Sequence, residues 1–216
     1  MKHWDVWQRM QTVHAYGAHH SADSPFSDQQ RQIAGAWLGS QPSPTSILAI
    51  GPGGPVEMRW LRSVLPVAEI VGLTAHEPER TAIMADGYTC AMGDVHETPF
   101  QSERFEAVFA NNVLEHLHAS YVALMEIRRI VRIGGTGYFI VPSFEGDEGG
   151  VGPFHIACHS VEEWQELLNK TGWRLLERFD QPADHTTRCY HHFRCEAEPP
   201  RGVHAIVFRE ICEAHA

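Results

Sequence analysis

The chain has 216 residues, of which 43 % are apolar and 20 % charged, so it can form a folded domain and is not an intrinsically disordered chain. Its formal net charge of −10 disfavours a nucleic-acid partner, because a phosphate backbone would be repelled. No apolar run approaches the roughly 20 residues that cross a bilayer. MKHWDVWQRM has no apolar signal-peptide core, and five cysteines without a C-x-x-C pattern fit a reducing compartment. We therefore expect a cytoplasmic protein with no nucleic-acid or membrane partner; the oligomeric state stays open, a homodimer included.

Two helices are predicted ahead of the main domain. Trp4, Trp7 and Met10 recur at three-residue intervals, which is typical of one face of a helix. Ser27, followed three positions later by Gln30, forms a capping-box pattern and predicts the start of a second helix. The linker GSQPSPTS, rich in proline and serine, ends this helical region.

The remainder of the chain alternates between strand-like and helix-like segments, which predicts a helical lid over residues 1–45 and one domain over residues 46–216. Strands that alternate with helices indicate a parallel sheet covered on both faces. The candidates TTRCYHHFRC and HAIVFRE, joined by AEPPRG, predict an antiparallel hairpin at the sheet edge. The predicted strands are 47–50, 69–74, 88–94, 104–111, 136–142, 173–179, 186–195 and 204–210, and the predicted helices are 55–64, 78–87, 112–131 and 160–171.

Small and polar residues follow several of these strands. Gly51, Gly53 and Gly54 come after the first strand, where they allow a tight turn and a close backbone approach to a ligand. The helix that follows offers free N–H groups. Asp94 ends the third strand and Asn111 the fourth. Because ligands of open α/β sheets bind beyond the carboxyl ends of the strands, these residues predict a nucleoside- or phosphate-binding edge.

Four segments in this order and spacing resemble the class I S-adenosylmethionine-dependent methyltransferases: ILAIGPGG, GDVHETPFQSERFEAVFANNVLEHL, EIRRIVRIGGTGYFIVPS and HSVEEWQELLNKTGW. The resemblance implies a Rossmann-like, doubly wound, seven-stranded α/β sheet that is mostly parallel with an antiparallel C-terminal strand. It also implies S-adenosylmethionine as cofactor and methyl transfer to an oxygen or nitrogen atom of a small molecule. Family members often close the pocket with N-terminal helices, in agreement with the predicted lid.

The family's cofactor contacts can be placed on this sequence residue by residue. Asp94 would accept a hydrogen bond from the adenine amino group, because a carboxylate is a strong acceptor, and Val95 would donate from its backbone. Asn111 would face the amino-acid end of the cofactor, and the glycine-turn backbone would approach its methionine part. The cofactor-binding residues implied are Gly51, Pro52, Gly53, Gly54, Thr74, Asp94, Val95 and Asn111.

Two positions depart from the family pattern. Ala49 stands where the first strand usually carries an acidic residue, and Thr74 stands where the second strand usually ends in a carboxylate that binds the ribose hydroxyls. Each lost charge-assisted hydrogen bond costs about 1.5–3 kcal/mol. Glu57 is a candidate to replace the first charge and Glu77 the second. The alternative function is therefore a catalytically altered domain that binds a metabolite or a protein partner. A nicotinamide-dependent oxidoreductase is a weaker third possibility, because Met58 and Thr74 occupy the regions where its fingerprint has a third glycine and an acidic residue.

Histidines are the candidates for catalysis. His155, after the fifth strand, lies where the family places its substrate-facing loop, and His116 follows the fourth strand; either can act as a base at neutral pH. A surface or hydrogen-bonded histidine is the alternative for each. No metal site is predicted, because Cys189, His191 and Cys195 are spread along one strand over about 20 Å.

Overall fold

The computed structural model describes residues 25–40, 42–143, 155–182 and 189–215. The first predicted helix, with Trp4, Trp7 and Met10, lies outside these residues, as does most of the loop that follows the fifth strand. The division of the chain near residue 45 stays a prediction.

One seven-stranded sheet forms the centre of the fold, in the order β3-β2-β1-β4-β5-β7-β6. Strands β1 to β5 pair in parallel, and β7 is antiparallel to both of its neighbours, β5 and β6. The predicted α/β sheet, mostly parallel with an antiparallel C-terminal strand, is thereby confirmed. The strands are β1 (Ser46–Ile50), β2 (Glu69–Thr74), β3 (Thr89–Met92), β4 (Phe105–Asn111), β5 (Val131–Pro142), β6 (Trp173–Pro182) and β7 (Cys189–Ala197).

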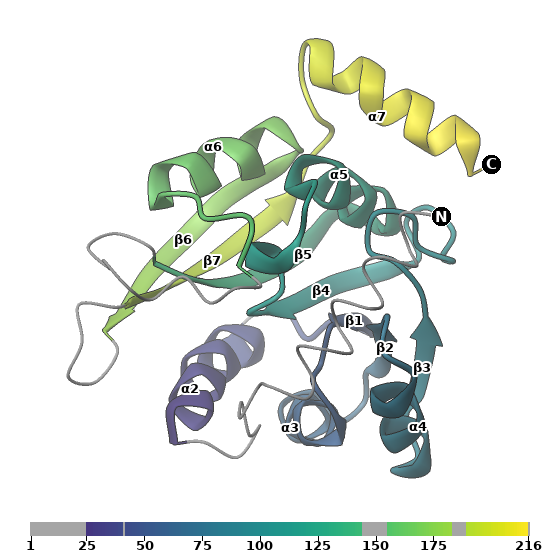
Figure 1. The fold of residues 1–216 in the computed structure, drawn as a ribbon, viewed down its shortest axis with the longest axis vertical. Coiled ribbons are helices and arrows are strands. Elements are labelled where there is room, and N and C mark those ends of the chain that lie inside the picture. Colours follow the sequence, from purple (N-terminus) through teal and green to yellow (C-terminus); the bar gives the residue numbers. More distant parts are fainter. Residues whose placement is uncertain (1–24, 41, 144–154, 183–188, 216) are drawn as a thin grey trace.

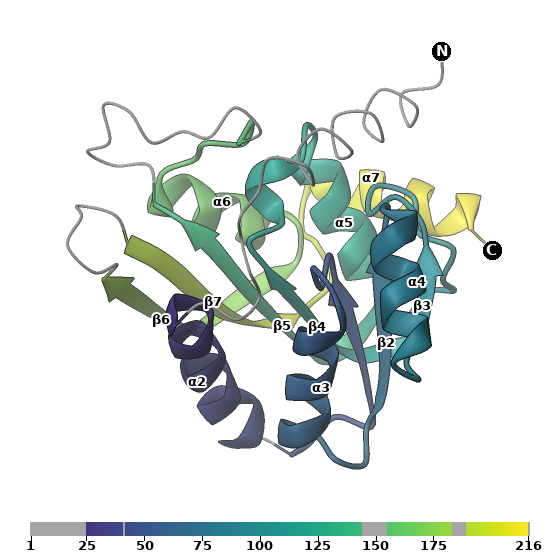
Figure 2. The same ribbon diagram turned by 60° about the horizontal axis from the view of Figure 1, so that its bottom comes forward.

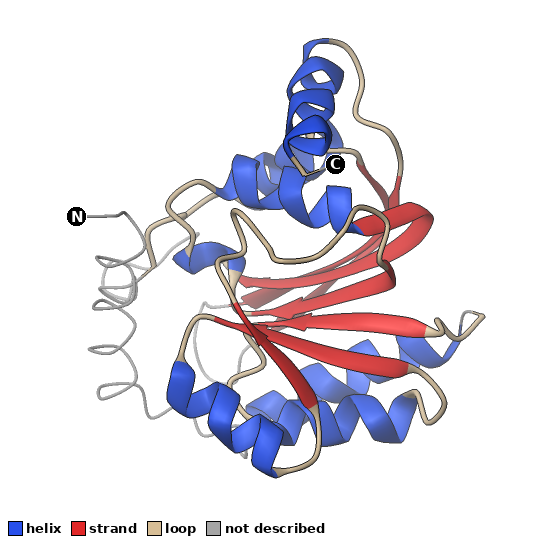
Figure 3. Ribbon diagram, turned by 90° about the vertical axis from the view of Figure 1, so that its right-hand side faces the viewer, coloured by secondary structure: helices blue, strands red, loops and turns tan. Residues whose placement is uncertain are grey.

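Helices cover both faces of the sheet, as a doubly wound fold requires (Figure 1). Helices α2 (Pro25–Ser40), α3 (Pro55–Val64) and α4 (Glu77–Ala85) lie on one face, where α2 and α3 run side by side (Figure 2). The opposite face carries the short helix η1 (Leu114–His116), α5 (Ser120–Ile130), α6 (Val161–Lys170) and α7 (Val203–Ala214), and Figure 3 shows the sheet between the two layers. Each face therefore has its own apolar core.

Short-range sequence signals set the ends of α6. The Ser160 hydroxyl accepts a hydrogen bond from the Glu163 backbone N–H at 3.2 Å, and the Glu163 carboxylate accepts one from the Ser160 N–H at 2.7 Å. After the helix, Gly172 has a φ of +85°, and a Cβ there would lie 2.4 Å from the carbonyl oxygen of Glu198. The predicted capping box and glycine stop are both confirmed.

The predicted helix over residues 112–131 is wrong in its first third. Asn112 has a φ of +54°, and its N–H donates to the carbonyl of Ile140 at 3.0 Å. That bond extends the pairing of β4 with β5, so an α-helix cannot begin there. The chain instead forms the short 3-10 helix η1, and α5 begins only at Ser120.

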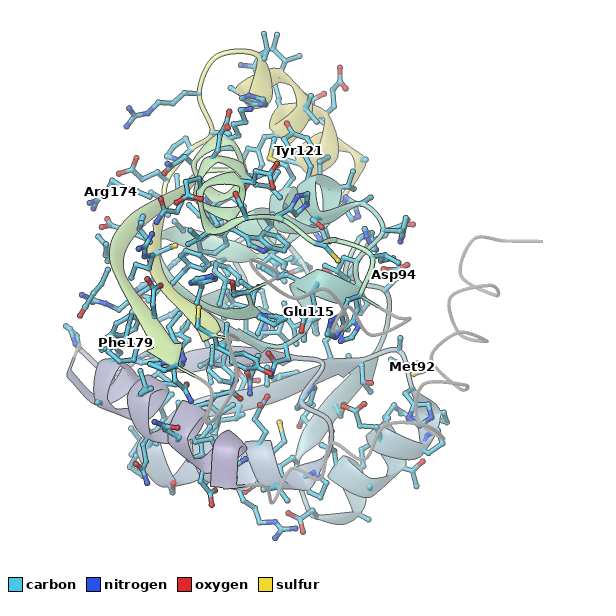
Figure 4. The ribbon with its side chains drawn as sticks, turned by 60° about the vertical axis from the view of Figure 1, so that its left-hand side comes forward. Met92, Asp94, Glu115, Tyr121, Arg174 and Phe179 are labelled. Carbon is cyan, nitrogen blue, oxygen red and sulfur yellow. The ribbon has the colours of Figure 1, made fainter. Side chains whose placement is uncertain are left out.

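The predicted strand HAIVFRE is also wrong, because these residues belong to helix α7. The antiparallel hairpin exists, but it is formed by β6 and β7. Arg128 of α5 lies 5.5 Å from the Phe208 ring of α7, and Tyr121, labelled in Figure 4, meets His204 at 2.9 Å. The apolar residues Val203, Ile206 and Val207 are three and four positions apart, which is the spacing of one face of a helix.

Within the described residues, no helix has the length and apolarity needed to cross a membrane.

Candidate functional site

The turn between β1 and α3 requires glycine at its first position. Gly51 has a φ of +57°, and its N–H donates to the carbonyl of Leu73 at 2.8 Å. A Cβ on Gly51 would lie 2.8 Å from Cγ2 of Val113, whereas one on Gly53 (φ +66°) would meet nothing within 4 Å. The turn is thus closely packed against the segment after β4 at Gly51 and open at Gly53. Its backbone can approach a ligand, as the sequence predicted.

A buried carboxyl group lies beside this turn, although Ala49 supplies none. Ala49 is fully buried in the apolar core. Glu57, in the first turn of α3, is only 6 % exposed. Burial raises the pKa of Glu57 well above its usual value, and a hydrogen bond with the Asn111 side chain opposes that rise. Glu57 therefore lies beside Asn111 at the end of β4; that it replaces the acidic residue missing at Ala49 stays a prediction.

A second carboxylate reaches the end of β2. The hydroxyl of Thr74 donates to Oε2 of Glu79 at 2.9 Å, and the backbone N–H of His76 donates to the same hydroxyl at 3.1 Å. Burial raises the pKa of Glu79, while hydrogen bonds from Thr74 and from the backbone of Gly53 lower it. The Glu79 carboxylate therefore lies between the end of β2 and the glycine turn.

The sequence analysis had named Glu77 for this role instead. Glu77 is bonded to Arg80 at 3.0 Å and to Thr81 at 3.3 Å, both on its own helix. Glu79 is the third residue of α4, and a side chain in the first turn can point back toward the preceding strand end. The place of Glu79 as third residue of α4 is the signal in the sequence that points to this carboxylate.

Asp94 and Val95 follow β3 in a tight turn. Oδ1 of Asp94 accepts from the backbone N–H of His96 at 2.9 Å and lies 2.6 Å from Nδ1 of the same histidine. Val95 is 7 % exposed and packs into the core. The turn places the Asp94 side chain, labelled in Figure 4, just after the end of β3. The packing of Val95 in the core holds the turn in place.

A fully buried ion pair on α5 holds the loop that follows the Asp94 turn, at Thr98 and Phe100. Arg129 donates to both carboxylate oxygens of Glu126, at 2.7 and 2.6 Å. Glu126 also accepts from the N–H and the hydroxyl of Thr98, at 2.8 and 2.7 Å, and Arg129 donates to the carbonyl of Phe100 at 2.8 Å. These bonds fix the loop that leads away from Asp94 against α5.

The two histidines proposed for catalysis lie next to each other. The ring centroids of His116, on η1, and His155, ahead of α6, are 4.8 Å apart. Glu115 accompanies them, with Oε1 3.8 Å from Nε2 of His116. The backbone N–H groups of Ile156 and Ala157 both donate to the Glu115 carbonyl at 2.9 Å, which fastens the His155 segment to η1. The structure thus brings the two candidates together from distant parts of the sequence.

Glu115 itself was not selected from the sequence, although it lies in the quoted segment NNVLEHL. It is 1 % exposed, and burial raises its pKa to about 8. Its place beside the histidines, labelled in Figure 4, depends on the fold of η1 rather than on any spacing in the sequence. η1 begins next to Val113, which packs against Gly51, so this cluster lies at the same edge as the glycine turn.

Within the described residues, the histidines and cysteines of β7 do not bring three potential metal ligands together, although Sγ of Cys189 lies 3.7 Å from Nε2 of His191. Cys195 is fully buried, and burial raises its thiol pKa far above the usual value. His192 is bonded to Tyr138 at 3.0 Å and to Gln181 at 2.8 Å, and burial lowers its pKa to about 4. In the part of the chain that the structure describes, only Glu115, His116 and His155 place three potential metal ligands together.

The sheet order, the antiparallel β7 and the glycine turn after β1 define a Rossmann-like methyltransferase fold. Residues 48–139 match the family described as methyltransferase domain. No curated protein sequence matches the chain. Residues 48–139 therefore form a methyltransferase domain, and the fold around them is that of the class I S-adenosylmethionine-dependent methyltransferases.

Solved structures with the same fold differ in what they do. The 4+2 cyclase SpnF is similar with a TM-score of 0.68 and 15 % identity, covering 85 % of this chain and 86 % of its own. Geranyl diphosphate C-methyltransferase from Streptomyces coelicolor A3(2), solved with S-adenosyl-L-homocysteine, has a TM-score of 0.65 and 13 % identity over 79 % of each chain. Haemonchus contortus phosphoethanolamine N-methyltransferase 2, solved with S-adenosyl-L-methionine, has a TM-score of 0.67 and 14 % identity over 80 % of this chain and 53 % of its own.

Proposed function

We propose that this chain binds S-adenosylmethionine at the carboxyl edge of the sheet and transfers its methyl group to an oxygen or nitrogen atom of a small-molecule acceptor. When bound, the cofactor supplies a methyl group activated by a sulfonium centre. The chain's own task is to hold that group in line with the acceptor and to exclude water. The proposed cofactor contacts are Gly51, Pro52, Gly53, Gly54, Thr74, Glu79, Asp94, Val95 and Asn111.

The observation that carries this proposal is the bond between Thr74 and Glu79 at the end of β2. The resemblance places the cofactor's ribose there and expects a carboxylate, which Thr74 does not provide. Glu79 provides one from the next helix, on the side of the glycine turn. Charge-assisted bonds to hydroxyl groups are the strong ones, so this carboxylate supports cofactor binding despite the changed strand end.

Glu57 is proposed to supply the negative charge that Ala49 does not provide. Oε1 of Glu57 is buried and has no hydrogen-bond partner among the described residues. A buried polar atom of this kind is normally satisfied by a ligand or by water. Oδ1 of Asn111 is also buried without a hydrogen-bond partner among the described residues. Both atoms lie by the glycine turn, where the amino-acid end of the cofactor would offer an ammonium donor.

The acceptor is proposed to bind beside His116 and His155, which would orient it by hydrogen bonding. The family's known chemistry does not fix the acceptor atom, since the similar structures include an N- and a C-methyltransferase by name. The net charge of −10 supports a small molecule rather than a nucleic acid. A cytoplasmic location belongs to this proposal as well, and the oligomeric state, a homodimer included, stays open.

Helix α2 is proposed as part of a lid over the site. Asn112 donates to Oε1 of Gln30 at 3.5 Å, and Gln181 of β6 donates to Oε1 of Gln29 at 3.1 Å. These contacts tie α2 to the residue that follows β4 and to the edge strand β6. The helix is proposed to border the pocket from the face of the sheet that carries α3.

Calorimetric titration with S-adenosylmethionine and S-adenosylhomocysteine tests the cofactor site. We expect micromolar binding that is lost in Asp94→Ala and kept in Glu97→Ala, a matched acidic residue in the same turn. Release of S-adenosylhomocysteine with pools of hydroxyl- and amine-bearing acceptors then tests transfer. Absence of binding at millimolar cofactor overturns the proposal.

A second candidate function is cofactor or metabolite binding without methyl transfer. The similarity to SpnF, a cyclase by name, favours it, because the same fold then serves another reaction. Binding that persists with no turnover across all acceptor pools would support this candidate over the first.

A further inference from the structure

The cluster of Glu115, His116 and His155 has the composition of a metal site. One carboxylate oxygen and two imidazole nitrogens lie within 4.8 Å of one another. Zinc bonds of about 2.0–2.2 Å to such atoms place neighbouring ligands roughly 3.3–3.5 Å apart. Small rotations of the side chains would therefore bring all three donors into the coordination shell of one ion.

Glu115 gives an independent indication that a ligand binds here. Its side chain is 1 % exposed, and Oε2 has no hydrogen-bond partner among the described residues. No lysine or arginine of the described residues forms an ion pair with it, and Nε2 of His116 lies 3.8 Å from Oε1, beyond hydrogen-bond distance. Buried carboxylates are normally paired, hydrogen-bonded or bound to a metal, and the histidine alone leaves one oxygen unsatisfied.

The backbone holds the donors in place. Glu115 and His116 are neighbours on η1, and His155 is fastened to them because Ile156 and Ala157 both donate to the Glu115 carbonyl. These two backbone hydrogen bonds join the segment after His155 to η1, directly beside the donor residues. Ligands presented by a supported backbone lose little entropy when an ion binds.

We propose that Glu115, His116 and His155 bind one divalent transition-metal ion at the acceptor side of the site. Mixed nitrogen and oxygen donors favour zinc, manganese or iron over magnesium and calcium, which prefer oxygen alone. Three protein ligands leave at least one position for water or for an oxygen atom of a bound molecule. With the ion bound, both histidines act as ligands. The metal site does not depend on the proposed methyl transfer, because binding of the ion can be measured without cofactor or acceptor.

The test uses the full chain, freed of metal with a chelator and titrated with Zn²⁺ and Mn²⁺ by calorimetry. Co²⁺ serves as a second probe, because its visible absorption reports coordination by the protein directly. Glu115→Gln and His155→Asn remove one donor each; His155 is partly exposed, so its replacement is expected to leave the fold intact. His159→Asn and His204→Asn are the controls, since both histidines lie outside the cluster.

We expect one equivalent of Zn²⁺ or Mn²⁺, with an affinity that falls more than about tenfold in Glu115→Gln and His155→Asn and is unchanged in both controls. Bound metal should also raise the unfolding temperature of the wild type and not that of His155→Asn. Failure of all three ions to bind at micromolar concentration overturns the proposal. Equal binding by the wild type and the cluster variants overturns it too, because the ion then binds elsewhere among the fifteen histidines.

Discussion

Replacement of Glu79 by alanine tests how the cofactor's ribose is held. Oε2 of Glu79 is 2.9 Å from the Thr74 hydroxyl, and Oε1 is buried without a hydrogen-bond partner among the described residues. If it accepts a hydrogen bond from the ribose, its loss costs about 1.5–3 kcal/mol of binding free energy. This corresponds to a dissociation constant for S-adenosylmethionine that is roughly tenfold to a hundredfold higher. Isothermal titration calorimetry measures the change directly.

Glu77→Ala is the matched control, because Glu77 lies on the same helix and pairs with Arg80. Burial raises the pKa of Glu79, so acidification protonates this carboxyl group at a higher pH than an exposed glutamate. Cofactor affinity should therefore fall on acidification in the wild type and follow a flatter course in Glu79→Gln. Equal affinities of Glu79→Ala and Glu77→Ala would refute the reasoning, and the ribose would then have to be held by other groups.

Three further predictions concern the stability of the fold around the site. Gly51→Ala should lower the free energy of unfolding by about 1–3 kcal/mol and Gly53→Ala by less, because only the first adds a clash to the strained φ; similar denaturation midpoints would contradict this. Arg129→Met should cost about 3–5 kcal/mol, since it leaves the Glu126 carboxylate buried and unpaired; a loss below about 1 kcal/mol would show that the pair is not needed. His192 has a folded-state pKa of about 4, below its unfolded value, so its contribution to stability is present above about pH 6.5 and is lost, by about 3 kcal/mol, as the pH falls to 4. His192→Gln should flatten urea-denaturation stability across this range, and an unchanged slope would assign the acid sensitivity to other groups.

Sequence patterns predicted the features that depend on neighbouring residues. Ser160 and Glu163 are three positions apart, so the cap they form is a local event that any fold containing this helix would keep. The turn at Gly51 likewise follows from the backbone freedom of glycine. Helix α7 was mispredicted, because an apolar run fits a strand or a helix until its partners are known. The helix start at Asn112 was mispredicted because the bond from Asn112 to Ile140 extends the pairing of β4 with β5.

The sequence by itself thus determined most of the alternation of strands and helices, the glycine turn after β1 and the resemblance to methyltransferases. Tertiary structure alone decided that Glu79 and not Glu77 reaches Thr74, and that Glu115 and His116 meet a histidine 39 residues further along the chain. Local propensities act over one or two turns of backbone. Contacts across the sheet edge depend instead on how both helical layers pack, and that packing is set by the whole core.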